Sequence, residues 1–313
     1  MAIDEAVLGA ELRGRHGVTT RARLRRLGMT DRMIDGLATR CRLRRLGRGV
    51  FVDPGSPDSF LQRVAIAWAM TGGVACFPTA GTVWEFRKTP RPPDVHVAVP
   101  WTRKVTSYLG VVVHRTCELR DCDIVRRRDG IVVTSPPRTV FDAAAWLDRH
   151  DLESMIEQGI HRSNFIVPTL WMQHQRLSAN GRRGSGEFAS VLAERPAWRK
   201  PAESDHELRL ERAMRTRGFP PLTRGHAIEV APGKFVHPDL AWHGGRMETA
   251  YDRWRDMKVR RVGNHVERVT DVALDECLDE TIEDLWALWQ SHRGKSTTEP
   301  VDDLPQKVGR AQA

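Results

Sequence analysis

Apolar and polar residues near the N-terminus follow a pattern that predicts two short helices and then a β-hairpin. The first helix is expected from about Thr20 to Leu27. Gly28 ends it, because glycine readily adopts the left-handed conformation that closes a helix. Thr30 then offers a side-chain oxygen as the N-cap of a second helix over residues 31–40.

The second helix is expected to be amphipathic. Three apolar residues recur at helical spacing and can bury one face: Met33, Ile34 and Leu37. The polar residues that stay available on the other side are Arg32, Asp35 and Arg40.

The stretch after this helix suits a wing hairpin, because apolar and basic residues are mixed up to the apolar run 50–52. Its apolar members are Leu43 and Leu46, and its basic members are Arg42, Arg44, Arg45 and Arg48. In a helix–turn–helix the second helix enters the major groove while arginines hold the flanking phosphates. Residues 1–53 are therefore predicted to be a winged helix–turn–helix DNA-binding domain; the alternative is a generic helical hairpin with a solvated basic face.

The remaining chain predicts two further folded units. Turn-forming residues at 53–57 separate the winged helix from a small α+β domain over residues 58–175. Residues 176–203 are rich in Gly, Ser, Arg and Pro, which predicts a basic linker around one short helix, 187–194. A third unit spans residues 204–292, and the polar tail 293–313 is expected to be disordered.

Within the α+β domain, we expect helices followed by a small sheet and more helices. The predicted helices cover 59–70, 79–86, 138–147 and 151–163, with a shorter one from Pro168, and the predicted strands cover 95–99, 111–114 and 131–134. The third unit is expected to have helices at 205–217, 249–262 and 278–290, a hairpin formed by 227–230 and 234–241, and a strand at 266–270.

Charge favours an anionic partner. The 313 residues contain 49 Lys and Arg against 40 Asp and Glu, a formal net charge of +9. Nucleic acid is the plain candidate for the partner of such a chain. Arginine outnumbers lysine, which suits phosphate and guanine contacts but equally fits a GC-rich genome.

Cysteine usage and hydropathy bear on the compartment. The 5 cysteines are odd in number, scattered, and form no CxxC pair, so we expect a reduced, cytoplasmic protein without a disulfide framework. The spacing of His114, Cys117 and Cys122 matches no common zinc pattern. The longest apolar run, residues 64–77, is too short to span a bilayer, so no membrane association is expected.

The N-terminal half resembles a known family. The segment GVTTRARLRRLGMTDRMIDGLATRCRLRRLGRGVFV is similar to the winged helix of AbiEi-type antitoxins. VHVAVP, GVVVHR and above all GIVVTSPPRTVFDAAAWL are similar to the companion region of that family, so the resemblance covers about residues 1–165. It implies operator binding, repression of the protein's own operon, and opposition to a nucleotidyltransferase-like toxin.

The third unit resembles a different family. SDHELRLERAMRTRGFP, HPDLAW and AYDRWRDMKVRRVGNHVERVTD are similar to the domain related to very-short-patch-repair endonucleases, over roughly residues 204–290. The resemblance implies a restriction-endonuclease-like PD-(D/E)xK fold. By motif position, Glu207 matches the helix glutamate, Asp239 the PD aspartate, and His243 the histidine beyond the central strand.

The third unit departs from that family where catalysis would depend on it. The family has a further strand carrying Glu-x-Asp after the PD aspartate, whereas here Trp242 runs directly into His243-Gly244-Gly245. Hydrolysis of this kind needs clustered carboxylates around a divalent cation. Asp239 and Glu207 alone make a poor magnesium site, so these residues are expected to be vestigial and no metal or other cofactor is expected. Glu248 is a possible substitute ligand.

The sequence therefore predicts an α+β multidomain protein: a winged helix–turn–helix, a small α+β domain, and a truncated restriction-endonuclease-like α/β domain. The leading function is sequence-specific binding of double-stranded DNA as an AbiEi-like antitoxin or transcriptional regulator. Arg32, Asp35 and the start of helix 31–40 would read bases, and the wing arginines would hold the backbone. Arg40 is a further DNA-binding candidate. The alternatives are a magnesium-dependent DNA endonuclease guided by the winged helix, and a toxin-neutralising protein without a DNA role.

Overall fold

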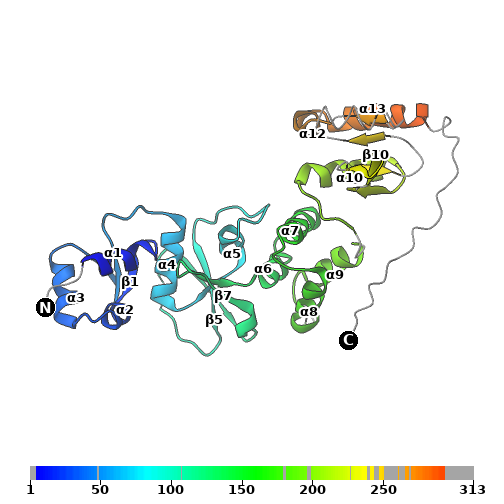
Figure 1. The fold of residues 1–313 in the computed structure, drawn as a ribbon. Coiled ribbons are helices and arrows are strands. Elements are labelled where there is room, and N and C mark those ends of the chain that lie inside the picture. The colour runs from blue at the N-terminus through cyan, green and yellow to red at the C-terminus, as the bar shows by residue number, and fades with distance from the viewer. Residues whose placement is uncertain are drawn as a thin grey trace, which may run out of the picture. The chain divides into compact units, whose positions relative to one another are not determined.

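The computed structural model of the chain is mixed α+β, which confirms the expected class. It divides into two compact units, Met1–Glu203 and Ser204–Ala313, and each is described by itself (Figure 1). The structure describes residues 5–47, 49–106, 108–178, 181–195, 199–225, 227–237, 240–242, 247–249, 260, 265–267 and 269–292.

The first unit opens with three helices and a small antiparallel sheet. In chain order these are α1 (Glu5–Arg13), β1 (Val18–Thr20), α2 (Arg21–Arg26), α3 (Asp31–Thr39), β2 (Arg44–Gly47) and β3 (Val50–Val52). β3 is the central strand, so that Phe51 lies opposite Thr19 on β1 and Arg45 on β2. The Phe51 ring is fully buried among Leu24, Ile34 and Leu37, which closes the three helices onto the sheet.

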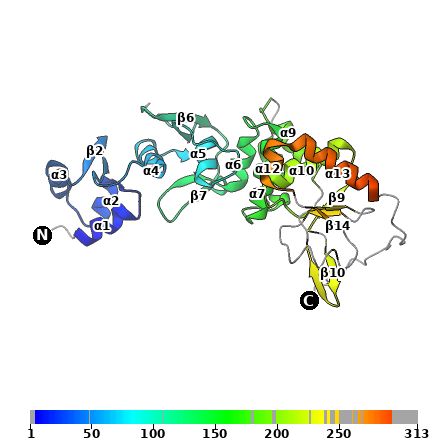
Figure 2. The ribbon, with the colours of Figure 1, turned by 90° about the horizontal axis from the view of Figure 1, so that it is seen from above.

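A five-stranded sheet follows in the same unit. Its elements are α4 (Phe60–Thr71), β4 (Val74–Ala75), α5 (Phe77–Val83), β5 (Val95–Pro100), β6 (Val111–Thr116), η1 (Asp121–Asp123), β7 (Ile124–Arg126) and β8 (Val132–Thr134). The strand order is β6-β5-β4-β8-β7, which places β6 at one edge (Figure 2). β4 runs antiparallel to β5 and parallel to β8.

The two sheets of this unit share one apolar core. Val50 and Val52 on β3 and Val64 on α4 belong to the same buried cluster as Val97 and Val133 on the larger sheet. Polar contacts reinforce this junction: the Gln62 side chain donates a hydrogen bond to the carbonyl of His16 at 3.0 Å. The elements from α1 to β3 and the five-stranded sheet therefore pack together within the first unit, whereas residues 1–53 and 58–175 were predicted as separate domains.

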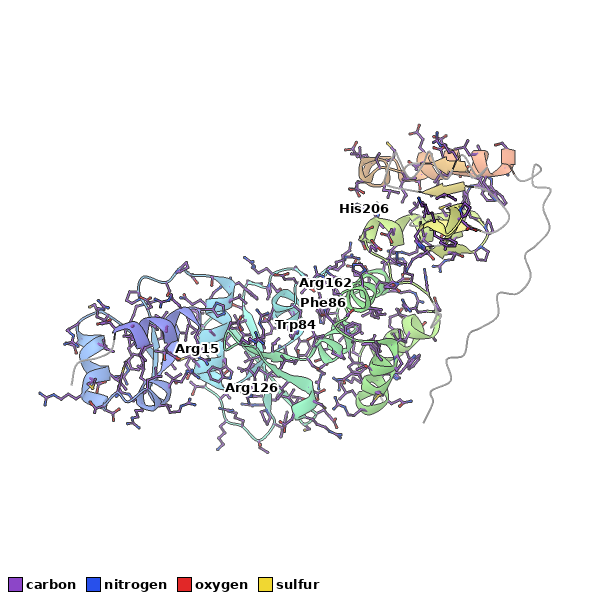
Figure 3. All side chains as sticks on the ribbon, viewed as in Figure 1. Arg15, Trp84, Phe86, Arg126, Arg162 and His206 are labelled. Atoms are coloured by element: carbon purple, nitrogen blue, oxygen red, sulfur yellow. The ribbon has the colours of Figure 1, made fainter. Side chains whose placement is uncertain are left out.

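Arg15, labelled in Figure 3, lies at the same junction. Its side chain passes so close to Gly130 that a Cβ at that position would lie 2.2 Å from a guanidinium nitrogen. Gly130 also has a φ of 85°, a conformation that favours glycine. The turn before β8 is therefore shaped to accept a side chain from the winged helix.

Four helices complete the first unit: α6 (Pro136–Ala143), α7 (Arg149–His161), α8 (Val167–Leu177) and α9 (Ser185–Ala193). Phe188 on α9 is fully buried in a second apolar core with Phe141, Met155 and Leu170. Trp84 and Phe86, labelled in Figure 3, connect α5 to this core. The short helix predicted at 187–194 within the linker is α9, and it packs into a core that the polar composition of residues 176–203 did not indicate.

Buried charges hold α6 in place. Arg138 donates to Asp142 at 2.8 Å and contacts Asp123 at 3.3 Å, while Arg182 donates to Asp142 at 3.0 Å. Burial raises the pKa of Asp142 despite these two arginines. Burial also acts to raise the pKa of Asp123, but its hydrogen bonds from Arg120 and Gln173 and the charge of Arg138 outweigh that effect and lower it. The TSPPRTVFDAA segment is thus the centre of a buried polar network.

The second unit begins with α10 (Asp205–Arg217) and has its own core. Its other elements are β9 (Leu222–Arg224), β10 (Ile228–Ala231), β11 (Lys234–Val236), β12 (Leu240–Trp242), β13 (Met247–Thr249), β14 (His265–Glu267), α12 (Asp271–Glu276) and α13 (Leu278–His292). Met214 on α10, Leu240 on β12 and Trp289 on α13 are buried together. Four of the strands form a sheet in the order β14-β13-β12-β9, and β10 and β11 form a separate hairpin.

The sheet of the second unit corrects one expectation. β13 pairs antiparallel with β12, where Ala241 lies opposite Glu248, and parallel with β14. The prediction that a strand is missing after Trp242 is therefore wrong, because the chain forms the strand β13 there. Thr249 belongs to this strand, not to the start of the predicted helix 249–262; of the rest of that helix the structure describes only Arg260. Three residues are too few to show the alternation that identifies a strand in sequence.

We expect Phe188→Ala to destabilise the first unit by about 3–5 kcal/mol, because it leaves a cavity in the second core. Gly186→Ala is the matched control on α9: no heavy atom lies within 4 Å of a Cβ there, so it should be neutral or stabilising by up to about 1 kcal/mol. Urea unfolding of each full-length variant measures the change in the free energy of unfolding. Hydrogen exchange in peptides from α6 and α7 shows whether the change affects the second core. A Phe188→Ala protein as stable as the control would contradict this packing.

Candidate nucleic-acid interface

The turn between α2 and α3 follows from local capping. Thr20 and Thr30 are the N-caps of the two helices, and their hydroxyls accept hydrogen bonds from the backbone N–H of Arg23 and Met33 at 3.3 Å. Gly28 has a φ of 87°, so it takes the left-handed conformation expected after α2. These caps set where α3 begins.

Helix α3 has one buried and one exposed face, as predicted. Ile34 and Leu37 are buried against the core of the winged-helix part, and Met33 is partly buried there. The side chains of Arg32, Asp35 and Arg40 are exposed. The helix therefore presents a polar face that carries both basic and acidic groups.

The acidic groups on that face are already engaged by arginines of α2. Arg21 contacts Asp31 at 2.9 Å and is also hydrogen-bonded to Asp35. Arg25 donates to Asp31 at 2.9 Å as well. Asp35 was expected to be available for reading bases, but its carboxylate is held by Arg21, whose guanidinium also lies 5.6 Å from the Phe51 ring centroid.

These contacts change the titration of Asp31. Hydrogen bonds from Arg25 and Arg21 lower the pKa of Asp31 to about 2. Its carboxylate also lies in the first turn of α3, where a negative charge is favourable. Arg21 and Arg25 are positioning residues for α3 that the sequence analysis missed, although an arginine at the start of α2 and an aspartate at the start of α3 were visible signals.

The hairpin predicted as the wing is formed by β2 and β3, which pair antiparallel. Arg44 and Arg45 on β2 are exposed, and Arg42 just before it forms an exposed ion pair with Glu5 at 2.7 Å. Arg48 lies outside the described residues. Gly47, next to the turn of the hairpin, packs against α4 so closely that a Cβ would lie 2.5 Å from the Met70 methyl carbon, which fixes this end of the hairpin to the shared core.

Three of the predicted DNA-contacting arginines have no carboxylate partner within the described part of the chain: Arg32, Arg40 and Arg44. Arg45 makes only a long contact, at 3.4 Å, to the carbonyl of Gly47. Guanidinium groups that are exposed and unpaired lose little when they exchange water for phosphate. The candidate interface therefore consists of the exposed face of α3 and the β2 strand of the wing.

Of the nuclease residues expected in the second unit, the structure describes the side chain of Glu207 alone. Glu207 lies in the first turn of α10, where its backbone N–H donates to the Ser204 hydroxyl at 3.1 Å. Asp239 and His243 lie outside the described residues, and for Glu248 only the backbone placement in β13 is described. Elsewhere on α10, Glu211 accepts a hydrogen bond from Arg224 at 3.0 Å.

Other site classes receive no support from the described residues. Within them, no group of three or more His, Cys, Asp and Glu side chains is arranged to hold a metal ion. All five cysteines are free, and only Cys76 is buried. None of the helices in this part of the chain has the length and apolarity that crossing a bilayer requires.

In comparisons with known proteins, no family model matches the chain, and no curated protein is significantly similar to it.

We expect the Asp31 carboxyl to titrate near pH 2 and Arg25→Gln to raise its pKa toward 3.8, because one of its two arginines is removed. Arg26→Gln is the matched control on the same helix turn, since the Arg26 side chain donates only to the carbonyl of Ala22. Carbon-13 NMR of the full chain measures the titration.

The sign of the linkage follows from the direction of the shift. A pKa below the unfolded value means that ionised Asp31 stabilises the folded state above about pH 3.8 and that this contribution is lost as the pH falls through about 2. Titration of Asp31 near 3.8 in the unmodified chain, or an equal effect of Arg26→Gln, would contradict the α2–α3 contacts.

Proposed function

We propose that this protein binds double-stranded DNA sequence-specifically through a winged helix–turn–helix, as an AbiEi-like antitoxin or transcriptional regulator. The observation that carries the proposal is the set of exposed arginines without carboxylate partners on two consecutive elements, α3 and β2. The order of helices and strands from α1 to β3 is also that of a winged helix. The net charge of +9 supports an anionic partner.

The proposed roles differ between the two elements. Arg32, at the start of α3, reads base edges in the major groove, where an arginine can make two hydrogen bonds to guanine. Arg40, Arg44 and Arg45 hold phosphates. Asp35 is assigned to orientation of α3 through Arg21 in place of the base contact first expected of it. The firm packing of Gly47 against α4 supports a wing that is already positioned before DNA arrives.

A nucleotidyltransferase-like toxin is the proposed protein partner. This part rests on the resemblance of VHVAVP, GVVVHR and TSPPRTVFDAA to the antitoxin family; in this chain, these segments form β5, β6 and α6. Co-expression with a toxin encoded beside this gene tests it: relief of toxicity by the full chain supports the pairing. Relief that survives loss of DNA binding would favour neutralisation by direct contact over repression.

We expect binding of the full chain to its own upstream DNA to weaken with salt, with a log–log slope of about −4 to −5 for four to six phosphate contacts. Arg44→Ala should weaken all sequences alike and reduce the slope by about 1. Arg32→Ala should cost about 1–3 kcal/mol on the specific duplex and little on a shuffled duplex. Fluorescence anisotropy over a salt series measures all three quantities.

Arg183→Ala is the matched control for this experiment. Arg183 is exposed in the same unit, precedes α9, and its substitution removes the same charge. An affinity that is insensitive to salt, or equal losses in Arg44→Ala and Arg183→Ala, would mean that net charge rather than the wing attracts DNA.

The second unit is proposed not to cleave DNA. After the PD aspartate, the strand that would carry Glu-x-Asp has the sequence Met247-Glu248-Thr249 and so contains a single acid. We expect no nicking of plasmid or mismatched duplex with Mg²⁺ or Mn²⁺, because too few carboxylates hold the cation. Metal-dependent cleavage that disappears in Asp239→Ala would overturn this and make the endonuclease alternative the better proposal.

A further inference from the structure

Two histidines lie side by side at the edge of the five-stranded sheet. β5 and β6 run parallel, with His96 opposite Val112 and Ala98 opposite His114. His96 and His114 are therefore diagonal neighbours, and successive residues in a strand alternate between faces, so both side chains project from the same face. β6 is the edge strand of this sheet, so within the described residues no further strand pairs with its outer side (Figure 2).

The two imidazoles face each other through ring nitrogens. Nδ1 of His96 lies 3.0 Å from Nε2 of His114, and the ring planes differ by 22°. The His96 backbone is anchored, because its N–H donates to the Thr79 hydroxyl at 2.8 Å. The Phe77 ring lies 4.3 Å from the His114 ring, centroid to centroid.

Phe77 is held in an unusual conformation at this site. Its φ of 52° lies in the left-handed region that bulky residues avoid. This backbone conformation accompanies the contact of the Phe77 ring with the His114 imidazole. The histidine pair is therefore packed against an aromatic ring as well as anchored through the His96 backbone.

The separation of the two nitrogens matches the bite of a metal chelate. Zinc–nitrogen bonds of about 2.0–2.1 Å at angles between 90° and 110° place two ligand nitrogens roughly 2.9–3.4 Å apart. Metal ligation requires unprotonated imidazole nitrogens. Burial lowers the pKa of both His96 and His114, which favours that form near neutral pH.

We propose that His96 and His114 form a two-histidine site for a borderline transition-metal ion such as Zn²⁺, Ni²⁺ or Cu²⁺. The ion replaces the proton that the two rings share and links edge strand β6 to β5. Because no third His, Cys, Asp or Glu joins the pair within the described residues, water or a donor from another molecule completes the coordination. Imidazole selects these ions over Mg²⁺ and Ca²⁺, which prefer oxygen ligands.

Wild-type protein alone allows the first test. Substoichiometric Cu²⁺ added to the metal-free full chain should broaden the imidazole NMR signals of His96 and His114 before those of the other histidines, because a paramagnetic ion relaxes its own ligands most strongly. Mg²⁺ at the same concentration should leave all signals unchanged. Broadening that begins at other histidines and spares this pair would overturn the proposal.

Variants then test the affinity. His96→Gln and His114→Gln should each weaken Zn²⁺ and Ni²⁺ binding by at least about tenfold in calorimetry, since loss of a ligand costs no less than loss of the group that orients one. His150→Gln, at an exposed position on α7, is the matched control and should bind as the wild type does. Metal binding that is unchanged in both pair variants, with their thermal unfolding also unchanged, would place the ion elsewhere.

Discussion

The shared apolar core between the winged-helix elements and the five-stranded sheet is the constraint on which the rest of the first unit depends. Both faces of β3 are buried. Phe51 packs among the helices α1 to α3, while Val50 and Val52 pack with α4 and the larger sheet. Side chains of successive strand residues point to opposite faces, so one three-residue strand belongs to two cores. The wing therefore cannot change its orientation without disturbing the sheet, and the arginines of β2 are held on a rigid base.

Charge is distributed differently between the interior and the surface of this unit. Inside, Arg138 on α6 pairs with both Asp142 and Asp123, so the cost of burying each charge is offset by its neighbours. On the surface, Arg21 and Arg25 of α2 neutralise the aspartates of α3, which would otherwise repel a phosphate backbone. Arginines without carboxylate partners remain at Arg32, Arg40 and Arg44, where a polyanion could approach.

Prediction from sequence succeeded where structure is set by local signals. The N-cap at Thr30, the left-handed Gly28 and the span Asp205–Arg217 of α10 were all readable, because caps and helical periodicity act within a few residues. The short strands β4, β7 and β9 were missed, since two or three residues become a strand only through pairing with distant partners.

Non-local contacts also explain the failures at the candidate site. The chain around α9 is polar and rich in glycine, so only the packing of Phe188 reveals that it is part of a core. Asp35 looked free because its partner, Arg21, lies on another helix. The pairing of His96 with His114 depends on the parallel register of β5 and β6. A separation of 18 residues in the sequence does not indicate that register.

Hydrogen exchange of the full chain with and without saturating upstream DNA tests the central claim most directly. If α3 and the wing bind DNA, exchange should slow in peptides covering residues 31–47, while α7 and α9 should be unaffected. Protection confined to peptides from residues 204–292, with none in α3 or β2, would contradict DNA binding by the winged helix.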